Sequence, residues 1–303
     1  MSYNTNMIEK IKTTLSLIVI IICLPYLVTF VVQGDFLNAP DQEEESGQEL
    51  DENTELLILT TASEMPLQYE KEALKAQTVI ARTNIAYARE NDQAEPEKVS
   101  REDMREHFGA KEFQKYYELL KSCAEETAGE TVTYDGKPVK LPYHYVSAGQ
   151  TRDFSQTDKS MPYLKSVSCA SDLRCEKFLK IEFIDKKQFR NKLRAAFPET
   201  EFPEEDINKM AAVSKRDSAS YVMSVQIPGK QISGEEFKNA FSLNSACFSI
   251  KETDGKVRII TKGYGQGYGM SQYEANEMAK EGSSYKQILE YFYSGIQIEN
   301  YHT

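Results

Sequence analysis

The chain of 303 residues contains no tryptophan, only three histidines and five cysteines, and fewer basic than acidic residues. Its 36 Lys and Arg against 47 Asp and Glu give a net charge of −11. Binding of nucleic-acid phosphates requires a positive surface, so this balance argues against nucleic acid as the partner. The histidines, His107, His144 and His302, have no metal-ligand spacing relative to the cysteines, so the sequence predicts neither a metal nor another cofactor.

Charged residues are also missing from residues 13–33. About 20 apolar residues suffice for a helix that crosses a bilayer, so we expect a transmembrane helix here. Lys10 and Lys12 precede the run and Asp35 follows it, which predicts a cytoplasmic segment at 1–12 and an extracytoplasmic remainder. A cleaved signal peptide is the alternative, but the length of the run and the lack of a small-x-small cleavage site favour an uncleaved anchor.

The segment 34–55 is acidic and poor in aromatic residues, and it cannot bury a core. We expect it to be a solvated tether between the membrane and a folded extracytoplasmic domain at 56–303. That length fits one large domain or two closely joined subdomains. Outside the cell, Cys169 and Cys175 are permitted, but not required, to form a disulfide.

Hydrophobic periodicity predicts helices and strands in mixed order along 56–303. Helices are expected at 69–89, 110–127, 186–196, 205–214, from Glu235 onward, and at 272–280. Strands are expected at 56–61, 131–134, 137–141, 163–168, 178–184, 220–227, 247–251 and 257–261. Asp135-Gly136 and Asp254-Gly255 are typical hairpin turns, so the strands should be mostly antiparallel. Regular βαβ alternation is missing, and the predicted class is therefore α+β.

Four glycines at alternate positions, Gly263, Gly265, Gly267 and Gly269, follow the last predicted strand. Alternate glycines remove side chains from one face of the chain, so a ligand or another backbone can approach the main-chain N–H and C=O groups. A glycine-rich turn packed on a helix is the alternative. If the run binds a ligand, Gly267 and Gly269 should give that ligand access to the backbone. Substitution there should then weaken ligand binding and change the thermal stability little.

Three ordered segments carry a resemblance to a known family. They are Ser63-Glu64-Met65-Pro66 with Glu72-Ala73-Leu74-Lys75-Ala76-Gln77, then His144 to Thr151, then the glycine run with Met270-Ser271-Gln272-Tyr273. In order and spacing they resemble the stage II sporulation protein D family, which is related to the amidase enhancers. The match extends over nearly all of 56–299.

The resemblance implies a peptidoglycan lytic transglycosylase, anchored in the mother-cell membrane of an endospore-forming bacterium and acting during engulfment. Its substrate would be glycan strands already stripped of stem peptides, and its partners would be the stage II sporulation proteins P and M. Such an enzyme needs one carboxyl group, because the second nucleophile is the 6-hydroxyl of the sugar itself.

Glu72 matches the family's catalytic glutamate, and Glu64 is the runner-up, although its place before Met65-Pro66 suits a cap or turn. A helix N-terminus lowers the pKa of a glutamate, so burial must raise it for Glu72 to serve as the acid. Residues expected to bind substrate are Gln77, Arg82, His144, Ser147, Gly149, Gln150, Gln266, Gly267, Gly269, Met270, Ser271, Gln272 and Tyr273.

The chain departs from the family at Gln266, where a histidine is usual, and the middle segment has Ala148, Gly149 and Gln150 where two glycines and an arginine are usual. An amide donates and accepts hydrogen bonds but does not titrate. These departures keep a second function open, a non-catalytic peptidoglycan-binding or amidase-enhancing module. A nucleotide-binding loop is a third, weaker interpretation, because no Gly-Lys-Ser/Thr follows the glycines.

Overall fold

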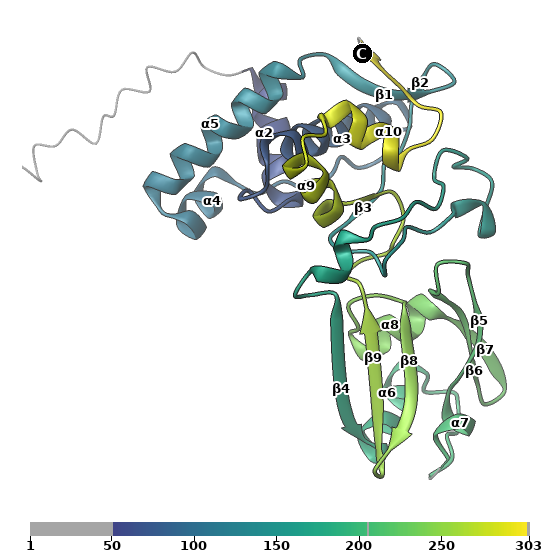
Figure 1. The fold of residues 1–303 in the computed structure, drawn as a ribbon. Coiled ribbons are helices and arrows are strands. Elements are labelled where there is room, and N and C mark those ends of the chain that lie inside the picture. Colours follow the sequence, from purple (N-terminus) through teal and green to yellow (C-terminus); the bar gives the residue numbers. More distant parts are fainter. Residues whose placement is uncertain (1–50, 205, 302–303) are drawn as a thin grey trace, which may run out of the picture. The chain divides into compact units, whose positions relative to one another are not determined.

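The computed structural model describes residues 51–204 and 206–301, and residues from Glu52 onward form one compact unit (Figure 1). Its class is α+β, as predicted, and the strands of the described residues pair antiparallel except for one short parallel pair, β10 with β3. In the described residues no helix is both long and apolar enough to cross a membrane. The predicted span at 13–33 and the predicted tether up to residue 50 lie outside the described residues.

The helical part is built around α3 (Lys71–Glu90), which contacts α2 (Glu52–Glu64), α5 (Ala110–Glu126), α9 (Gln272–Lys280) and α10 (Tyr285–Phe292). Alanines on several sides of α3, including Ala73, Ala76 and Ala81, are fully buried. Small side chains let neighbours approach from several directions, so this helix is surrounded as its composition predicted. The short helix α4 (Arg101–Phe108) packs on α5.

The strand predicted at 56–61 is wrong, because these residues lie inside α2. Leu56 to Thr61 are all buried, so the run contacts protein on every side. A short apolar run has no period that separates a strand from a buried helix, and here packing against α3 and α5 determines the outcome. The acidic residues at 52–55 belong to this helix rather than to a tether.

Two short sheets accompany the helices. One has the order β11-β1-β2, formed by β1 (Glu130–Tyr134), β2 (Lys137–Pro138) and β11 (Gln297–Asn300). The other pairs β3 (Tyr143–His144) with β10 (Met270–Ser271), which directly precedes α9. The hairpin predicted around Asp135-Gly136 is confirmed, and β3 and β10 bring the middle segment and the end of the glycine run side by side.

The second part of the unit contains two three-stranded sheets. The first has the order β4-β9-β8, formed by β4 (Leu179–Asp185), β8 (Phe248–Thr253) and β9 (Lys256–Lys262). The second has the order β5-β6-β7, formed by β5 (Ala212–Arg216), β6 (Val222–Ile227) and β7 (Lys230–Ser233). The helices of this part are α6 (Lys186–Ala196), α7 (Ile207–Met210) and α8 (Gly234–Phe241).

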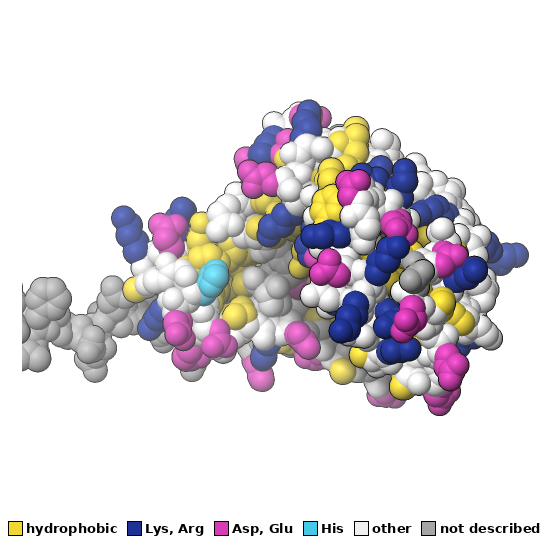
Figure 2. All heavy atoms as spheres, turned by 90° about the horizontal axis from the view of Figure 1, so that it is seen from below, with side chains coloured by type: hydrophobic (Ala, Val, Ile, Leu, Met, Phe, Trp, Pro, Cys, Tyr) yellow, Lys and Arg dark blue, Asp and Glu magenta, His cyan; other side chains and the backbone are white. Residues whose placement is uncertain are grey.

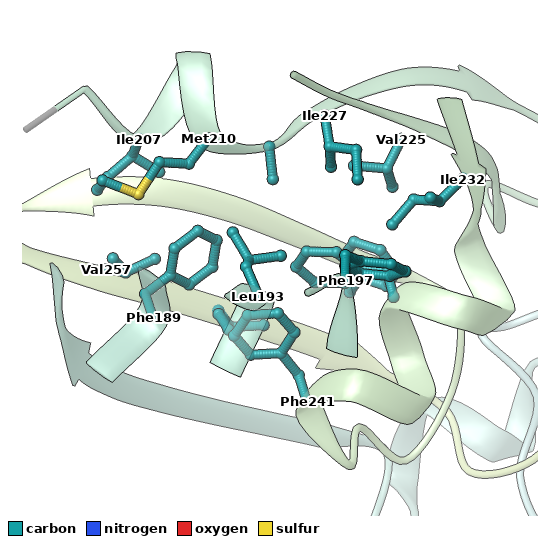
Figure 3. Packing of buried hydrophobic residues seen from close by; sticks show 14 of the residues in the cluster. Phe189, Leu193, Phe197, Ile207, Met210, Val225, Ile227, Ile232, Phe241 and Val257 are labelled. Atoms are coloured by element: carbon teal, nitrogen blue, oxygen red, sulfur yellow. The ribbon is translucent and has the colours of Figure 1, made fainter. Parts of the chain in front are cut away.

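Figure 3 shows the core of this part, in which Phe189 and Leu193 of α6 meet Phe241 of α8 and Val257 of β9. A capping box at Ser233 and Glu236 fixes the start of α8. On the face of the described residues in Figure 2, basic and acidic side chains are interspersed.

Two further predictions in this region are corrected. The helix expected at 205–214 is reduced to α7, since Ala211 adopts an extended backbone and the next residues pair with β6 as β5. The strand expected at 163–168 retains only an isolated bridge between Gln150 and Ser168. Two 3₁₀ turns that the sequence did not indicate, at Phe154–Gln156 and Ser171–Arg174, lie in the same middle region.

Candidate functional site

Two adjoining hollows share Glu64, Pro96 and Tyr143 in their walls, and we call them together the Glu64 groove. Their volumes are about 520 Å³ and about 420 Å³, within the range of sites that bind small molecules. The larger hollow combines aromatic walls with a few polar groups. Its other lining residues are Asn84, Tyr87, Ala88, Gln93, Ala94, Lys140, Leu141, Pro142, Phe154, Met161, Gln266 and Tyr268.

Glu64 is the last residue of α2 and is half-buried at the junction of the two hollows. Gln77 Nε2 donates to Glu64 Oε2 at 2.8 Å, and the Tyr143 phenol also hydrogen bonds to this carboxyl group. Burial raises the pKa of Glu64 to about 7, although both hydrogen bonds act in the opposite direction. A carboxyl group with this pKa carries a proton for much of the time near neutral pH, as a general acid must.

Gln272, the first residue of α9, holds this arrangement from a distant part of the chain. Its side-chain Nε2 donates to the Glu64 backbone carbonyl at 2.6 Å and lies 3.2 Å from Gln77 Oε1. Gln77 and Gln272, both expected to bind substrate, therefore lie together, and both are buried beside Glu64.

Glu72 lies in a different setting. Its carboxylate is 2.7 Å from Lys75 Nζ and accepts a hydrogen bond of 2.8 Å from the backbone N–H of Tyr285, the first residue of α10. Lys75 also contacts Glu126 at 2.7 Å, so the cluster joins α3, α5 and α10. The side chain of Glu72 is 32% exposed and does not line the Glu64 groove. These contacts are those of a residue that ties helices together.

Arg82 also makes internal contacts rather than lining the groove. Its guanidinium donates to the carbonyls of Glu130 and Ala124, at 2.9 and 3.2 Å, and to Thr127 Oγ1 at 3.2 Å. Burial lowers the pKa of Arg82 to about 10. The side chain therefore connects α3 to the end of α5 and the start of β1.

We predict that Arg82→Ala lowers the free energy of unfolding by roughly 2–3 kcal/mol, because two buried carbonyls lose a charged donor. Glycan binding per folded molecule should stay within about twofold of the parent. A change of that size corresponds to a free energy well below the cost of leaving a buried polar group unpaired. Urea unfolding followed by circular dichroism measures the first quantity. A variant with unchanged stability and lost glycan binding would instead place Arg82 in the site.

His144 is buried, and its Nδ1 lies 3.0 Å from the Tyr268 carbonyl, to which it donates as a neutral ring. Burial lowers the pKa of His144 to about 4, so the imidazole stays neutral at physiological pH. Within the described residues its Nε2 has no hydrogen-bond partner. The ring holds the carbonyl of Tyr268, a lining residue, but does not itself line the groove.

Ser147 and Ser271 surround the carboxylate of Asp172, which the sequence did not single out. The backbone N–H of Ser147 donates to Asp172 Oδ2 at 2.7 Å, and the Ser271 hydroxyl lies 2.8–2.9 Å from both carboxylate oxygens. All three residues are buried, and desolvation raises the pKa of Asp172 to about 6. This network anchors the start of α9, whose N-cap is Ser271.

Apart from Gln266, the remaining predicted residues lie outside the groove walls. Gln150 Nε2 donates to the Ser218 carbonyl, and the Gly149 carbonyl accepts from Cys169 N–H. Met270 is fully buried in β10, and Tyr273 N–H donates to the Tyr145 carbonyl. Of the predicted set, Gln77 and Gln272 contact Glu64 and Gln266 lines the groove.

The glycine run does not present an open face to a ligand, and that expectation is corrected. A Cβ at Gly265 would lie 2.6 Å from His144 Cβ, one at Gly267 would lie 2.5 Å from the Tyr221 ring, and one at Gly269 would lie 1.8 Å from the Pro142 carbonyl oxygen. The close approach that alternate glycines indicate is real, but the approaching groups belong to the protein.

Sequence reasoning missed several aromatic and charged residues that shape the site. Tyr268 packs against Phe154, with ring centroids 5.1 Å apart, and Arg152 lies over the Tyr268 ring at 4.3 Å. Arg152 is fixed by a buried ion pair with Asp217 at 2.6 Å. The only signal for them in the sequence was Tyr268, the tyrosine between Gly267 and Gly269.

The four cysteines of the described residues, Cys123, Cys169, Cys175 and Cys247, are free and buried. The pair at 169 and 175 is therefore not joined in this structure. In the same part of the chain, no three His, Cys, Asp or Glu side chains converge as metal ligands do.

Comparison with known proteins identifies relatives over most of the chain. A family model described as stage II sporulation protein matches residues 52–134. Stage II sporulation protein D of Bacillus amyloliquefaciens is 30% identical over 259 residues, which is 80% of this chain and 73% of the relative, and the protein of that name from Bacillus subtilis (strain 168) shows the same values. An amidase enhancer of Bacillus subtilis is 33% identical over 82 residues, 27% of this chain and 11% of the relative.

Proposed function

The chain belongs to the stage II sporulation protein D family, and on this premise we propose that it is a peptidoglycan lytic transglycosylase that acts on peptide-stripped glycan strands during sporulation. Two glutamates, Glu64 and Glu97, line the groove, and the observation that carries the proposal is the raised pKa of Glu64, which both hollows share. One carboxyl group suffices for this reaction, whereas a hydrolase uses a pair.

Glu64 is the group we assign as the general acid and base. The protonated carboxyl group donates its proton to the glycosidic oxygen, and the bond between that oxygen and C1 breaks. The sugar's own 6-hydroxyl then attacks C1 and gives its proton to Glu64, so that a 1,6-anhydro ring closes and the carboxyl group is restored. Water takes no part, and the proton count balances over one turnover.

We therefore assign the catalytic role to Glu64 and not to Glu72, the residue that the family resemblance indicates. The carboxylate of Glu72 is occupied by Lys75 and by the backbone N–H of Tyr285 at the start of α10. Glu64 instead has neutral donors and a buried setting, with Gln77 and Gln272 holding it in place. The assignment of Glu72 stays a prediction, and the contacts favour Glu64.

The groove also suits a polysaccharide. Apolar walls come from Tyr87, Tyr143, Phe154 and Tyr268, and hydrogen-bonding groups come from Gln93, Lys140 and Gln266. Sites of this kind combine apolar contact area with a few orienting polar groups. A glycan strand lying along both hollows would pass Glu64 at their junction.

A non-catalytic, amidase-enhancing module is the second candidate. The similarity of 82 residues to an amidase enhancer and the presence of Gln266 favour it. The two candidates differ in one measurable respect, because the module binds glycan strands without shortening them. Incubation of the full-length chain with peptide-stripped glycan, followed by size analysis of the strands, separates them.

The cellular setting is likewise proposed. We infer a single-pass membrane protein with a transmembrane helix at 13–33, a cytoplasmic N-terminus and a catalytic domain in the space between the two membranes of the sporangium. Stage II sporulation proteins P and M are proposed as partners, the first as the amidase that strips the stem peptides. The unit from Glu52 onward would then reach the glycan from the mother-cell membrane.

The pKa of Glu64 gives a prediction for the pH profile. The acid must be protonated to act, so kcat/KM should fall tenfold per pH unit on the alkaline side of about pH 7, where Glu64 ionises. Rates of anhydro-product formation between pH 5 and pH 9 measure this limb. Tyr143→Phe removes a hydrogen bond that lowers the pKa, so it should move the limb to higher pH. A profile that is flat to pH 9 would exclude Glu64 as the acid.

A further inference from the structure

Strand β4 forms the outer edge of the sheet β4-β9-β8 (Figure 1). It pairs with β9 along its whole length, from Leu179 opposite Lys262 to Asp185 opposite Lys256. No other strand among the described residues pairs with its second edge. A seven-residue strand with an open edge is a template for another strand, and proteins usually cover or disrupt such edges.

The backbone groups at this open edge belong to the odd-numbered residues. Gly263 N–H donates to the Phe178 carbonyl at 2.7 Å, so residue 178 forms a hydrogen-bonded pair with β9. Hydrogen-bonded and non-hydrogen-bonded pairs alternate along antiparallel strands. The N–H and C=O groups of Leu179, Ile181 and Phe183 therefore point away from β9, toward the open edge.

The side chains of the same three residues form an exposed apolar stripe. Leu179, Ile181 and Phe183 are 48%, 49% and 55% exposed, and alternation along the strand places them on one face of the sheet. The other face is the one whose Val257 and Ile259 are buried in the core with α6 and α8. Three large apolar side chains in a row on an open edge mark a surface that gains from being covered.

We propose that the edge of β4 pairs antiparallel with β4 of a second copy of this chain, about a two-fold axis at Ile181. The sequence is complementary to itself in this register. Ile181 faces Ile181 of the copy, Leu179 faces Phe183, and Lys180 faces Glu182. Beyond these, Phe178 faces Ile184 and Lys177 faces Asp185.

Each of these cross-strand pairs is favourable, because apolar residues face apolar residues and opposite charges face each other. A two-fold axis uses one surface twice, so self-complementarity is what a symmetric dimer requires. The outward backbone groups of 179, 181 and 183 become hydrogen-bonded pairs in the same register. The two three-stranded sheets then form one continuous sheet.

The charges favour a second copy over a lipid surface. The neighbouring strands carry three basic residues on the same exposed face as the stripe, Lys251, Arg258 and Lys262, and these would suit anionic lipid. Asp185, however, lies on the same exposed face and would be repelled by such a surface, and the strand also carries Glu182 on its other face. A partner strand must carry the opposite charge at each facing position, and β4 of a second copy does so.

Disulfide trapping of the full-length chain in a mild detergent tests the register. In the proposed pair the two Cα atoms of residue 181 lie about 5.5 Å apart, which suits a disulfide. Ile181→Cys should therefore form a covalent dimer under mild oxidation. In the matched control, Leu179→Cys, the equivalent atoms are separated by roughly 14 Å and should not cross-link. The parent chain gives the background from its native cysteines.

Charge exchange tests the same pairing without cross-linking. Lys180→Glu and Glu182→Lys each place like charges opposite each other twice per dimer, so each should weaken self-association about tenfold or more. An equimolar mixture of the two variants restores opposite charges between copies without restoring the ion pair that Lys180 and Glu182 make within one strand. Sedimentation analysis should show that the mixture dimerises as the parent does.

The outcomes decide the proposal. Equal cross-linking of Ile181→Cys and Leu179→Cys, or none with either, overturns pairing at this register. The pairing is also overturned if Lys180→Glu and Glu182→Lys each self-associate as strongly as the parent. If the parent is monomeric and binds vesicles of anionic lipid through this face, the surface serves a membrane instead. Selective trapping at 181 together with rescue in the mixture confirms the two-fold pair.

Discussion

Glu64→Gln is expected to slow cleavage of peptide-stripped glycan by about 10²–10⁴-fold, the usual contribution of a general acid. Glutamine keeps the size and most hydrogen bonds of the side chain but has no proton of suitable acidity to donate. Gln272 still holds the segment, since it contacts the backbone of residue 64 and not its carboxyl group. Glycan binding and the melting temperature should therefore change little, and turnover alone should be lost.

Glu72→Gln is the matched control for this experiment. It removes the charge from the ion pair with Lys75, but Lys75 keeps Glu126 as a second partner at 2.7 Å. The variant should cleave glycan at a rate within about threefold of the parent, a much smaller change than the loss of a general acid causes. Retained activity in Glu64→Gln combined with its loss in Glu72→Gln would return the catalytic role to Glu72.

Gly267→Ala is expected to destabilise the fold by about 3 kcal/mol. Gly267 has φ +81°, a region that costs other residues roughly 1–2 kcal/mol, and the added Cβ would lie 2.5 Å from the buried Tyr221 ring. The melting temperature should fall by about 6–12 °C, by the usual relation for a unit of this size. Differential scanning calorimetry gives this value directly.

Gly255→Ala separates the two causes of that effect. Gly255 lies in the turn between β8 and β9 with φ +75°, but a Cβ there would meet nothing within 4 Å. It should therefore show only the conformational cost, about 1–2 kcal/mol. If Gly267→Ala keeps the parental melting temperature and loses glycan affinity, the run contacts substrate after all.

The glycine run shows what its sequence pattern determines and what it leaves open. Alternate glycines indicate that something approaches the backbone closely, and this is confirmed at Gly265, Gly267 and Gly269. The pattern does not identify the approaching group. Tyr221 and Pro142 lie far away in sequence, so only the tertiary fold decides that protein, and not sugar, fills the space.

The surroundings of Glu64 could not be predicted from the sequence, because the strand predicted at 56–61 was wrong. With a strand at 56–61, residues 63–66 form a turn, and Glu64 has no defined neighbours. As the last residue of a buried helix, the same glutamate meets Gln77 and, across 208 positions in the sequence, Gln272. Gln77 and Gln272 were predicted as site residues through the family resemblance, whereas the burial that raises the pKa of Glu64 arises only from packing.

Elements with a strong local signal were predicted closely. The helices at 186–196 and 272–280 have the predicted bounds, and the hairpin of β8 and β9 turns at Asp254-Gly255. The pair of Glu72 with Lys75, three residues apart on α3, was also accessible from helical spacing and points to a structural ion pair. Weakly periodic segments such as 163–168 and 205–214 were decided by tertiary contacts instead.

The central claim is that this chain cleaves glycan without water, and the ends of its products test it most directly. Purified full-length chain would be incubated with peptide-stripped glycan, and the fragments would be analysed by mass spectrometry. We expect 1,6-anhydro ends, 18 Da lighter than reducing ends, that appear with the parent and not with Glu64→Gln. Reducing ends, or strands that remain intact with the parent protein, would contradict it.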